Sequence, residues 1–176
     1  MPASGAARPR RVVLLDFDDE VDVRQWTAVN DVVMGGLSRS AFEKAGPGIA
    51  RFRGVVSLEN SGGFASVRTA PRGWNSSGAS AFVLRVLGDG HAYKFTLRTD
   101  DGFDGVQYQS RFTPPAGEWQ EARLAVASFA ATFRGRIVPG SAPLDPDRVR
   151  ALGLMISDRQ AGPFELLVDW IGVETG

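Results

Sequence analysis

Hydrophobic and polar residues alternate along two neighbouring segments in the middle of the chain, residues 91–99 and 106–112. Such alternation is typical of strands that bury one face. The inward positions are apolar: Tyr93, Phe95, Leu97, Val106, Tyr108 and Phe112. The outward positions are polar: Lys94, Thr96, Arg98, Gln107, Gln109 and Arg111. If the two strands pair antiparallel, the outward side chains form one polar face, which is either an ordinary solvated surface or a surface that reads a ligand.

Other apolar runs predict further strands at residues 12–17, 51–58, 80–87, 119–126, 151–157 and 164–173. Gly54 looks like a turn, residues 127–133 look irregular or single-turn helical, and Trp119 and Trp170 look like core residues. Because no amphipathic crossover helix is visible, we expect an all-β fold, an antiparallel β-sandwich of jelly-roll type. A single domain is expected over residues 12–176, after a disordered tail of residues 1–11.

Two polar, glycine-rich stretches interrupt the strand pattern. Residues 26–40 (WTAVNDVVMGGLSRS) mix apolar anchors with short hydrogen-bonding groups, and the glycine pair at 35–36 supplies backbone freedom. We expect an ordered loop that presents Asn30 and Asp31 at one edge of the fold. The alternative is a plain connection in which these two side chains cap their own backbone. Residues 59–68 (ENSGGFASVR) are interpreted in the same way.

Composition excludes several classes of protein. The 176-residue chain has no formal net charge, which removes the long-range attraction to nucleic acid, and it has no apolar run of about 18 residues that would predict a transmembrane helix. It has no cysteine, and its one histidine, His91, lies in a predicted hairpin turn, a poor place for a catalytic base. Asp18, Asp19, Glu20 and Asp22 could hold calcium, although such a run is usually a solvated edge. We expect neither a metal nor a cofactor.

Enzymatic chemistry has weak support in the sequence. Neither glycine pair, 35–36 or 62–63, is followed by the Lys-Ser/Thr of a phosphate-binding loop. A hydrolase that pairs Asp31 with a second carboxylate is a minor alternative. Only two of the 20 basic residues are lysine, and we interpret this arginine excess as the codon bias of a GC-rich, bacterial genome. Residues 1–11 lack the apolar core of a signal peptide, so a cytoplasmic protein is expected.

Several segments together match a known family. They are Trp26 with residues 30–38 (NDVVMGGLS), residues 52–60 (FRGVVSLEN), 62–68 (GGFASVR), 88–90 (GDG) with Tyr93, 133–136 (FRGR) and 160–171, where QAGPF leads to DWI. From about residue 16 to residue 173 they resemble the complex I intermediate-associated protein 30 family. The resemblance implies a galactose-binding-like jelly roll. It also implies an assembly factor that holds partly built NADH:ubiquinone oxidoreductase without catalysis, whereas plant relatives act in photosystem biogenesis.

The leading hypothesis is therefore a non-enzymatic binding protein that helps to assemble NADH:ubiquinone oxidoreductase or another membrane complex. Its partners would be respiratory complex I subunits or assembly intermediates, met in the cytoplasm or at the periphery of the inner membrane. The residues expected to bind come from both glycine-rich stretches and the polar strand face: Asn30, Asp31, Met34, Gly35, Gly36, Ser38, Asn60, Gly63, Ser66, Arg68, Lys94, Arg98, Gln107, Gln109 and Arg111. The alternative is a carbohydrate-binding module of the same fold, in which sugar rings stack on tryptophan.

Overall fold

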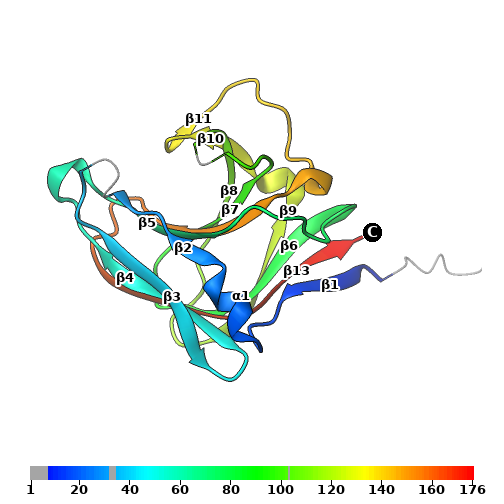
Figure 1. Ribbon diagram of the computed structural model, residues 1–176, viewed down its shortest axis with the longest axis horizontal. Helices are drawn as coiled ribbons and strands as arrows, with labels where there is room; N and C mark the ends of the chain where they lie inside the picture. The colour runs from blue at the N-terminus through cyan, green and yellow to red at the C-terminus, as the bar shows by residue number, and fades with distance from the viewer. Residues whose placement is uncertain (1–7, 32–34, 103) are drawn as a thin grey trace, which may run out of the picture.

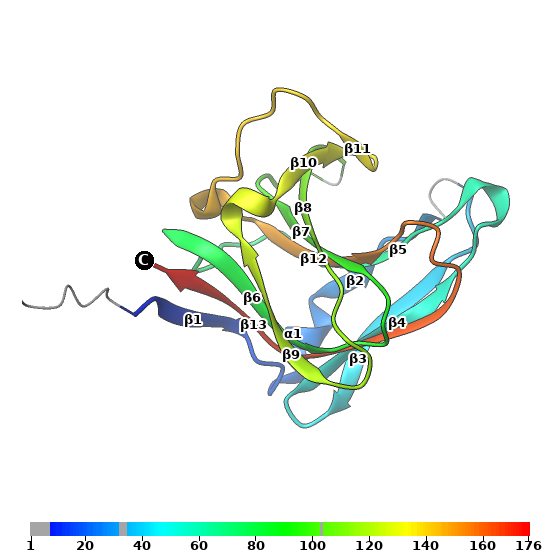
Figure 2. The same ribbon diagram turned by 180° about the vertical axis from the view of Figure 1, so that it is seen from behind.

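Two antiparallel sheets are packed face to face in the structure, a computed structural model that describes residues 8–31, 35–102 and 104–176 (Figure 1; seen from behind in Figure 2). The first sheet has the strand order β3 (Arg39–Gly46), β4 (Ile49–Val56), β13 (Gly162–Thr175), β6 (Ala79–Leu87) and β9 (Trp119–Ala125), with β1 (Arg10–Leu15) paired to β13. The second has the order β11 (Arg136–Ile137), β10 (Ala130–Phe133), β8 (Gln107–Phe112), β7 (Tyr93–Arg98), β12 (Ala151–Ile156), β5 (Ala65–Thr69) and β2 (Trp26–Ala28). The all-β, antiparallel sandwich expected from the sequence is confirmed.

The last strand, β13, organises the first sheet. Its first half pairs with β4 and its second half with β1, while β6 runs along its opposite edge. A register shift between Val168 and Trp170 interrupts the pairing with β6. Asp169 stands at this bulge, and its Oδ2 atom lies 3.2 Å from Nε of Arg85. Asp169, a charged residue within β13, therefore has a cationic partner on the neighbouring strand β6.

Helical structure among the described residues is short. It consists of α1 (Glu20–Arg24) and the 3₁₀ turns η2 (Glu59–Ser61), η3 (Val126–Ser128) and η4 (Pro146–Arg148). The acidic run near residue 20 has a local role, because the Asp19 side chain caps α1 by accepting from the backbone nitrogen of Val21, and Asp22 accepts from that of Phe17. In the part of the chain that the structure describes, no helix has the length and apolar character needed to cross a membrane.

The core lies between the sheets and is rich in aromatic rings. Phe52 and Phe164 from the first sheet pack at 4.9 Å between ring centroids, and Phe82 packs at 5.7 Å against Phe95 of the second sheet. Tyr93 also packs against Phe164 and is fully buried. These contacts between the sheets supply the apolar burial that holds the sandwich closed.

Three local expectations were wrong. Strand β4 continues through Gly54, where glycine is required because a Cβ would lie 1.9 Å from the carbonyl oxygen of Arg39 on β3. In residues 127–133 the expected single helical turn is present as part of η3, but the strand β10 follows it where no strand was expected. Trp119 and Trp170 are only half-buried and lie outside the core: Arg85 stacks over the Trp119 ring and Arg11 over the Trp170 ring.

The amino-terminal boundary also differs from the expectation. Strand β1 begins at Arg10, which pairs with Thr175 of β13. The Arg11 guanidinium donates to Glu121 and to Glu174, a residue that is 7% exposed. Arg10 and Arg11 therefore belong to the folded sheet.

Candidate functional site

A groove of about 610 Å³ lies on the face of the second sheet that points away from the first. Strands β7 and β8 pair antiparallel, as their alternation predicts, with Thr96 opposite Gln109 and Lys94 opposite Arg111. Their apolar side chains point into the core, and their polar side chains point into or beside the groove. The polar strand face is thus a hollowed surface, in which Thr96 and Arg98 are 6% and 5% exposed.

The floor of the groove is a row of residues that crosses the sheet. Arg68 on β5 is opposite Gly153 on β12, and Gly153 is opposite Thr96 on β7. A Cβ on Gly153 would lie 2.2 Å from Oγ1 of Thr96 and 3.1 Å from the carbonyl oxygen of Val67. Glycine is therefore required on the middle strand, because Thr96 of the flanking strand occupies the place that a Cβ would take.

Ion pairs hold the charged side chains at both ends of the groove. At one end Nζ of Lys94 lies 3.1 Å from Asp158, and Nε of Arg111, which is exposed and is not among the lining residues, lies 3.3 Å from the same carboxylate. At the other end NH2 of Arg134 lies 2.8 Å from Asp104. Lys94 and Arg111 share one carboxylate, whereas Arg134 has Asp104, so both ends carry paired charges and the first keeps an excess of positive charge.

Two arginines lie between these ends. Arg98 is buried and its NH2 atom lies 3.3 Å from Asp100, while Arg68 is half-buried. Burial lowers the pKa of Arg68, and the positive charge of Arg98 lowers it further. The negative charge of Asp104 raises the pKa of Arg68 and so opposes both effects. Two desolvated guanidinium groups therefore share the central part of the groove.

Asp31 joins the two glycine-rich stretches behind this groove. Its carboxylate is 1% exposed and accepts hydrogen bonds from the backbone nitrogen (2.9 Å) and Oγ (2.6 Å) of Ser38, and from the backbone nitrogens of Gly63 (2.7 Å) and Phe64 (3.4 Å). Burial raises the pKa of Asp31, but these hydrogen bonds outweigh burial and hold the pKa below its ordinary value of 3.8. We refer to Asp31, Ser38, Gly63 and Phe64 as the Asp31 clasp.

Glycine is required around the clasp because the chain approaches the carboxylate closely. A Cβ on Gly36 would lie 2.3 Å from the carboxyl carbon of Asp31, and a Cβ on Gly62 would lie 2.6 Å from its Oδ2 atom. Both distances are far shorter than a van der Waals contact. The glycines of the two stretches thus make room for one buried carboxylate.

Asn30 ties the same loop to the groove. Its Oδ1 atom accepts a hydrogen bond from Oγ of Ser40 (2.7 Å) and from the backbone nitrogen of Ser66 (3.0 Å). Oγ of Ser66, which lines the groove, donates to the carbonyl oxygen of Val29. Asn30 therefore positions the end of strand β5, from which Arg68 also projects.

The residues expected to bind fall into separate groups. Six of them line the groove together: Ser66, Arg68, Lys94, Arg98, Gln107 and Gln109. Asp31, Gly36 and Ser38 are buried and are not among the residues that line the groove, so they can position the loop but do not face a partner held there. Gly35 and Asn60 are exposed with positive φ angles of 88° and 54°. Met34 lies outside the described residues.

Sequence interpretation missed other groove residues. Met155 on β12 pairs with both Ser66 and Lys94, and the alternation of β12 (ALGLMI), with Leu152, Leu154 and Ile156 in the core, is the signal that could have found it. Thr132, Arg134, Asp104, Ser157 and Asp158 also line the groove. Several of these come from loops, whose path no periodicity reveals.

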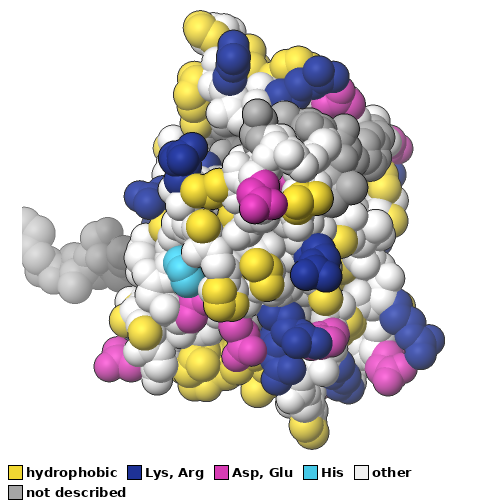
Figure 3. Space-filling view, turned by 90° about the vertical axis from the view of Figure 1, so that its left-hand side faces the viewer, with side chains coloured by type: hydrophobic (Ala, Val, Ile, Leu, Met, Phe, Trp, Pro, Cys, Tyr) yellow, Lys and Arg dark blue, Asp and Glu magenta, His cyan; other side chains and the backbone are white. Residues whose placement is uncertain are grey.

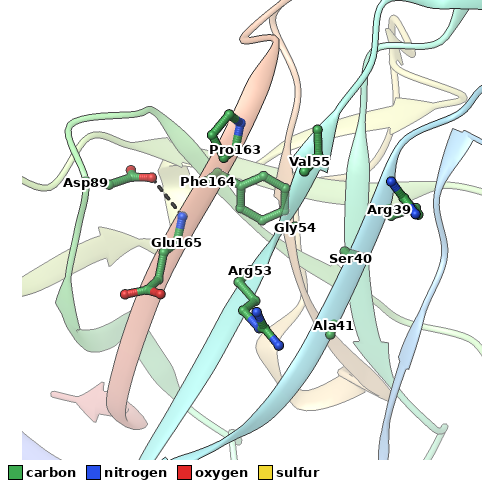
Figure 4. A pocket seen from close by; sticks show the side chains of 10 residues that line it. All are labelled: Arg39, Ser40, Ala41, Arg53, Gly54, Val55, Asp89, Pro163, Phe164 and Glu165. Atoms are coloured by element: carbon green, nitrogen blue, oxygen red, sulfur yellow. Dashed lines mark hydrogen bonds between the residues drawn. The ribbon is translucent and has the colours of Figure 1, made fainter.

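A shallower depression of about 740 Å³ lies on the first sheet, over β3, β4 and the start of β13 (Figure 4). Several of its polar groups are engaged: Nε of Arg53 lies 2.5 Å from Glu43, and Asp89 accepts from the backbone nitrogen of Glu165 at 2.8 Å. Nδ1 of His91 lies 2.9 Å from the same Asp89 carboxylate. His91 is thus part of a structural turn.

Other kinds of site have little support. Among the residues that the structure describes, no cluster of three or more histidine, aspartate or glutamate side chains is placed to hold a metal ion. The side of the molecule shown in Figure 3 has basic, acidic and apolar side chains interspersed, without a broad field of one sign. Such a surface does not attract a polyanion over long range.

Comparison with solved structures shows the fold. A family 11 carbohydrate-binding module of the cellulosomal cellulase Lic26A-Cel5E of Clostridium thermocellum aligns with a TM-score of 0.71 and 15% identity over 95% of both chains. A family 11 module from the same organism, in complex with a β-1,3-1,4-mixed-linked tetrasaccharide, aligns with a TM-score of 0.67 and 16% identity over 94% of this chain and 96% of that one. At this identity the likeness is one of fold.

Comparison of sequences shows the family. "Complex I intermediate-associated protein 30, mitochondrial" of Mus musculus is 28% identical over 185 residues, which cover 93% of this chain and 56% of the relative, and that of Drosophila melanogaster is 24% identical over 92% of this chain and 62% of the relative. This chain thus spans little more than half the length of these relatives. They are eukaryotic mitochondrial proteins and do not support the bacterial origin inferred from the arginine excess. The family profile matches residues 15–168, and the chain therefore belongs to the Complex I intermediate-associated protein 30 (CIA30) family.

Proposed function

We propose that this protein binds a partner protein during the assembly of NADH:ubiquinone oxidoreductase (complex I) and catalyses no reaction. The observation that carries the proposal is the family match over residues 15–168, which encloses every residue that lines the groove. The curated relatives are named as complex I intermediate-associated proteins. The proposal includes a place at the periphery of the membrane in which complex I is built.

The groove is the surface proposed to hold the partner. Its walls offer neutral hydrogen-bonding groups from Gln107, Gln109 and Thr132 beside the charged arginines. A rigid sheet supplies these side chains, since they come from paired strands. Such a preorganised polar face loses little conformational entropy when a partner binds.

The burial of Asp31, the carboxylate that a hydrolase would use, also agrees with a role in binding. Asp31 is 1% exposed and already accepts four hydrogen bonds. A general acid or base must reach a substrate atom, and a carboxylate of this kind does not. The clasp therefore supports a structural role for Asp31.

The experiment that tests the proposal is genetic complementation in the native cell. Deletion is expected to lower the amount of fully assembled complex I on native gels, and the wild-type protein is expected to restore it. The variant Gln109→Trp places an indole in the groove and is expected to fail, whereas Arg24→Gln, on α1 and 76% exposed, is expected to succeed. Normal complex I in the deletion strain would refute the proposal.

A carbohydrate-binding function is the second candidate, favoured by the likeness to the family 11 module. Sugar-binding sites stack pyranose rings on aromatic side chains. Of the described residues that line the groove, only Phe64 is aromatic. A glycan array with β-linked glucans, probed with the wild type and with Gln109→Trp, distinguishes the two candidates. The carbohydrate-binding function expects glucan binding that Gln109→Trp abolishes, whereas the assembly proposal expects no such binding.

A further inference from the structure

The charge of Arg98 is only partly compensated by the residues that the structure describes. The residue is 5% exposed, and its one ion-pair partner, Asp100, has a side chain that is 59% exposed. Its Nε atom is buried and has no hydrogen-bond partner among the described residues. A buried cation with weak compensation is costly, so this part of the groove favours the arrival of a negative charge.

Arg68 brings a second cation to the same place. It comes from β5, while Arg98 comes from β7, and the strand between them, β12, carries Ala151 and Gly153 on this face. No long side chain of β12 therefore separates the two arginines at this point. Burial is the first cause of the lowered pKa of Arg68, and the positive charge of Arg98 is the second, which agrees with two cations close to each other on this face.

The surroundings favour an anion of single charge. Among the described lining residues four are basic (Arg68, Lys94, Arg98 and Arg134) and two are acidic (Asp104 and Asp158). Asp158 pairs with Lys94 and Asp104 pairs with Arg134, and the charge of Asp104 also acts on Arg68 and Arg98. These carboxylates would repel a nucleic acid or an anionic bilayer that extended along the groove, whereas four basic against two acidic lining residues leave an excess of two positive charges to attract a single anion.

We propose that Arg68 and Arg98 form a recognition subsite for one carboxylate, presented by an acidic side chain of the partner protein. This rests on the proposed function, since it names the chemistry of the partner that the same groove holds. The planar guanidinium fork matches a planar carboxylate with paired hydrogen bonds. Gln107 and Gln109 beside the arginines can bond to the peptide groups that flank the acidic residue.

The test is an NMR titration of the full chain, followed at the arginine Nε–H resonances. The probes are the capped pentapeptide Gly-Gly-Glu-Gly-Gly, its Gln counterpart, inorganic phosphate, and phosphatidylglycerol vesicles at matched ionic strength. The Glu peptide is expected to shift the Arg68 and Arg98 resonances and to bind about tenfold more tightly than the Gln peptide. Arg68→Gln is expected to remove this preference, and Arg24→Gln to retain it.

Thermal unfolding of each variant shows whether it is folded. Arg98→Lys keeps the positive charge but loses the planar guanidinium group, and it is expected to reduce the preference for the Glu peptide in a folded protein. Equal affinity for the Glu and Gln peptides, or tighter binding of phosphate or of vesicles at the same resonances, would overturn the subsite. If the Glu preference is found but deletion leaves complex I normal, the subsite stands and the proposed function fails. If deletion lowers complex I and no Glu preference is found, the subsite alone fails.

Discussion

Asp31 accepts a 2.7 Å hydrogen bond from the backbone nitrogen of Gly63, which lies 32 residues further along the chain. This bond joins the loop before β3 to the loop before β5. The second loop leads directly into the strand that carries Ser66 and Arg68 to the groove. The two glycine-rich stretches of the sequence therefore form one structural unit, which positions the β5 side of the groove.

Removal of the Asp31 carboxylate should destabilise the fold. Asp31→Ala removes the acceptor of three backbone N–H groups, of which that of Ser38 is buried and those of Gly63 and Phe64 are partly buried, and of the Ser38 hydroxyl; we expect a loss of about 3–5 kcal/mol in the free energy of unfolding. Urea denaturation at pH 7 measures this loss. The control is Glu59→Gln at a neighbouring exposed position, which should change stability by about 0.5 kcal/mol or less. Equal stability of the two variants would show that the clasp contributes little.

The contribution of Asp31 should depend on pH. Because its pKa in the folded protein is below the ordinary value of 3.8, folding favours the charged form. The stabilisation is fully present above the unfolded pKa and is lost as pH falls through the folded pKa. The difference in unfolding free energy between the wild type and Asp31→Asn should therefore be constant near neutral pH and shrink below about pH 4. A difference that stays constant down to pH 2.5 or so would contradict this account of the carboxylate.

A side chain at Gly62 should lower the stability of the fold. Its φ of −69° and ψ of −167° suit any residue, so the cost of Gly62→Ala is steric: a Cβ would lie 2.6 Å from Oδ2 of Asp31 and 2.9 Å from the carbonyl oxygen of Ser57. We expect a loss of about 1–3 kcal/mol. Gly73 is the matched control, since the nearest atom to its Cβ would be NH1 of Arg150 at 3.9 Å. Thermal unfolding that ranks Gly73→Ala as the more damaging change would refute the steric argument.

The sequence predicted the sandwich, and it grouped some of the residues that line the groove, for clear physical reasons. Alternation along β7 and β8 determines which side chains share a face, so the grouping of Lys94, Arg98, Gln107 and Gln109 followed from the pattern. The half-buried state of Trp119 and Trp170 did not follow, because an arginine that covers an outer aromatic ring comes from another strand. Nor did the burial of Asp31, since its donors are backbone groups brought near by tertiary folding.

The central claim is that the groove on the second sheet holds a partner during complex I assembly. The most direct test places the photocrosslinking residue p-benzoylphenylalanine at Gln109, in the groove, and separately at Arg53, on the opposite sheet, in the native cell. After irradiation and purification, mass spectrometry identifies the proteins attached at each position. The account predicts complex I subunits attached at residue 109 and absent at residue 53; subunits attached at residue 53 alone, or equally at both positions, would contradict it.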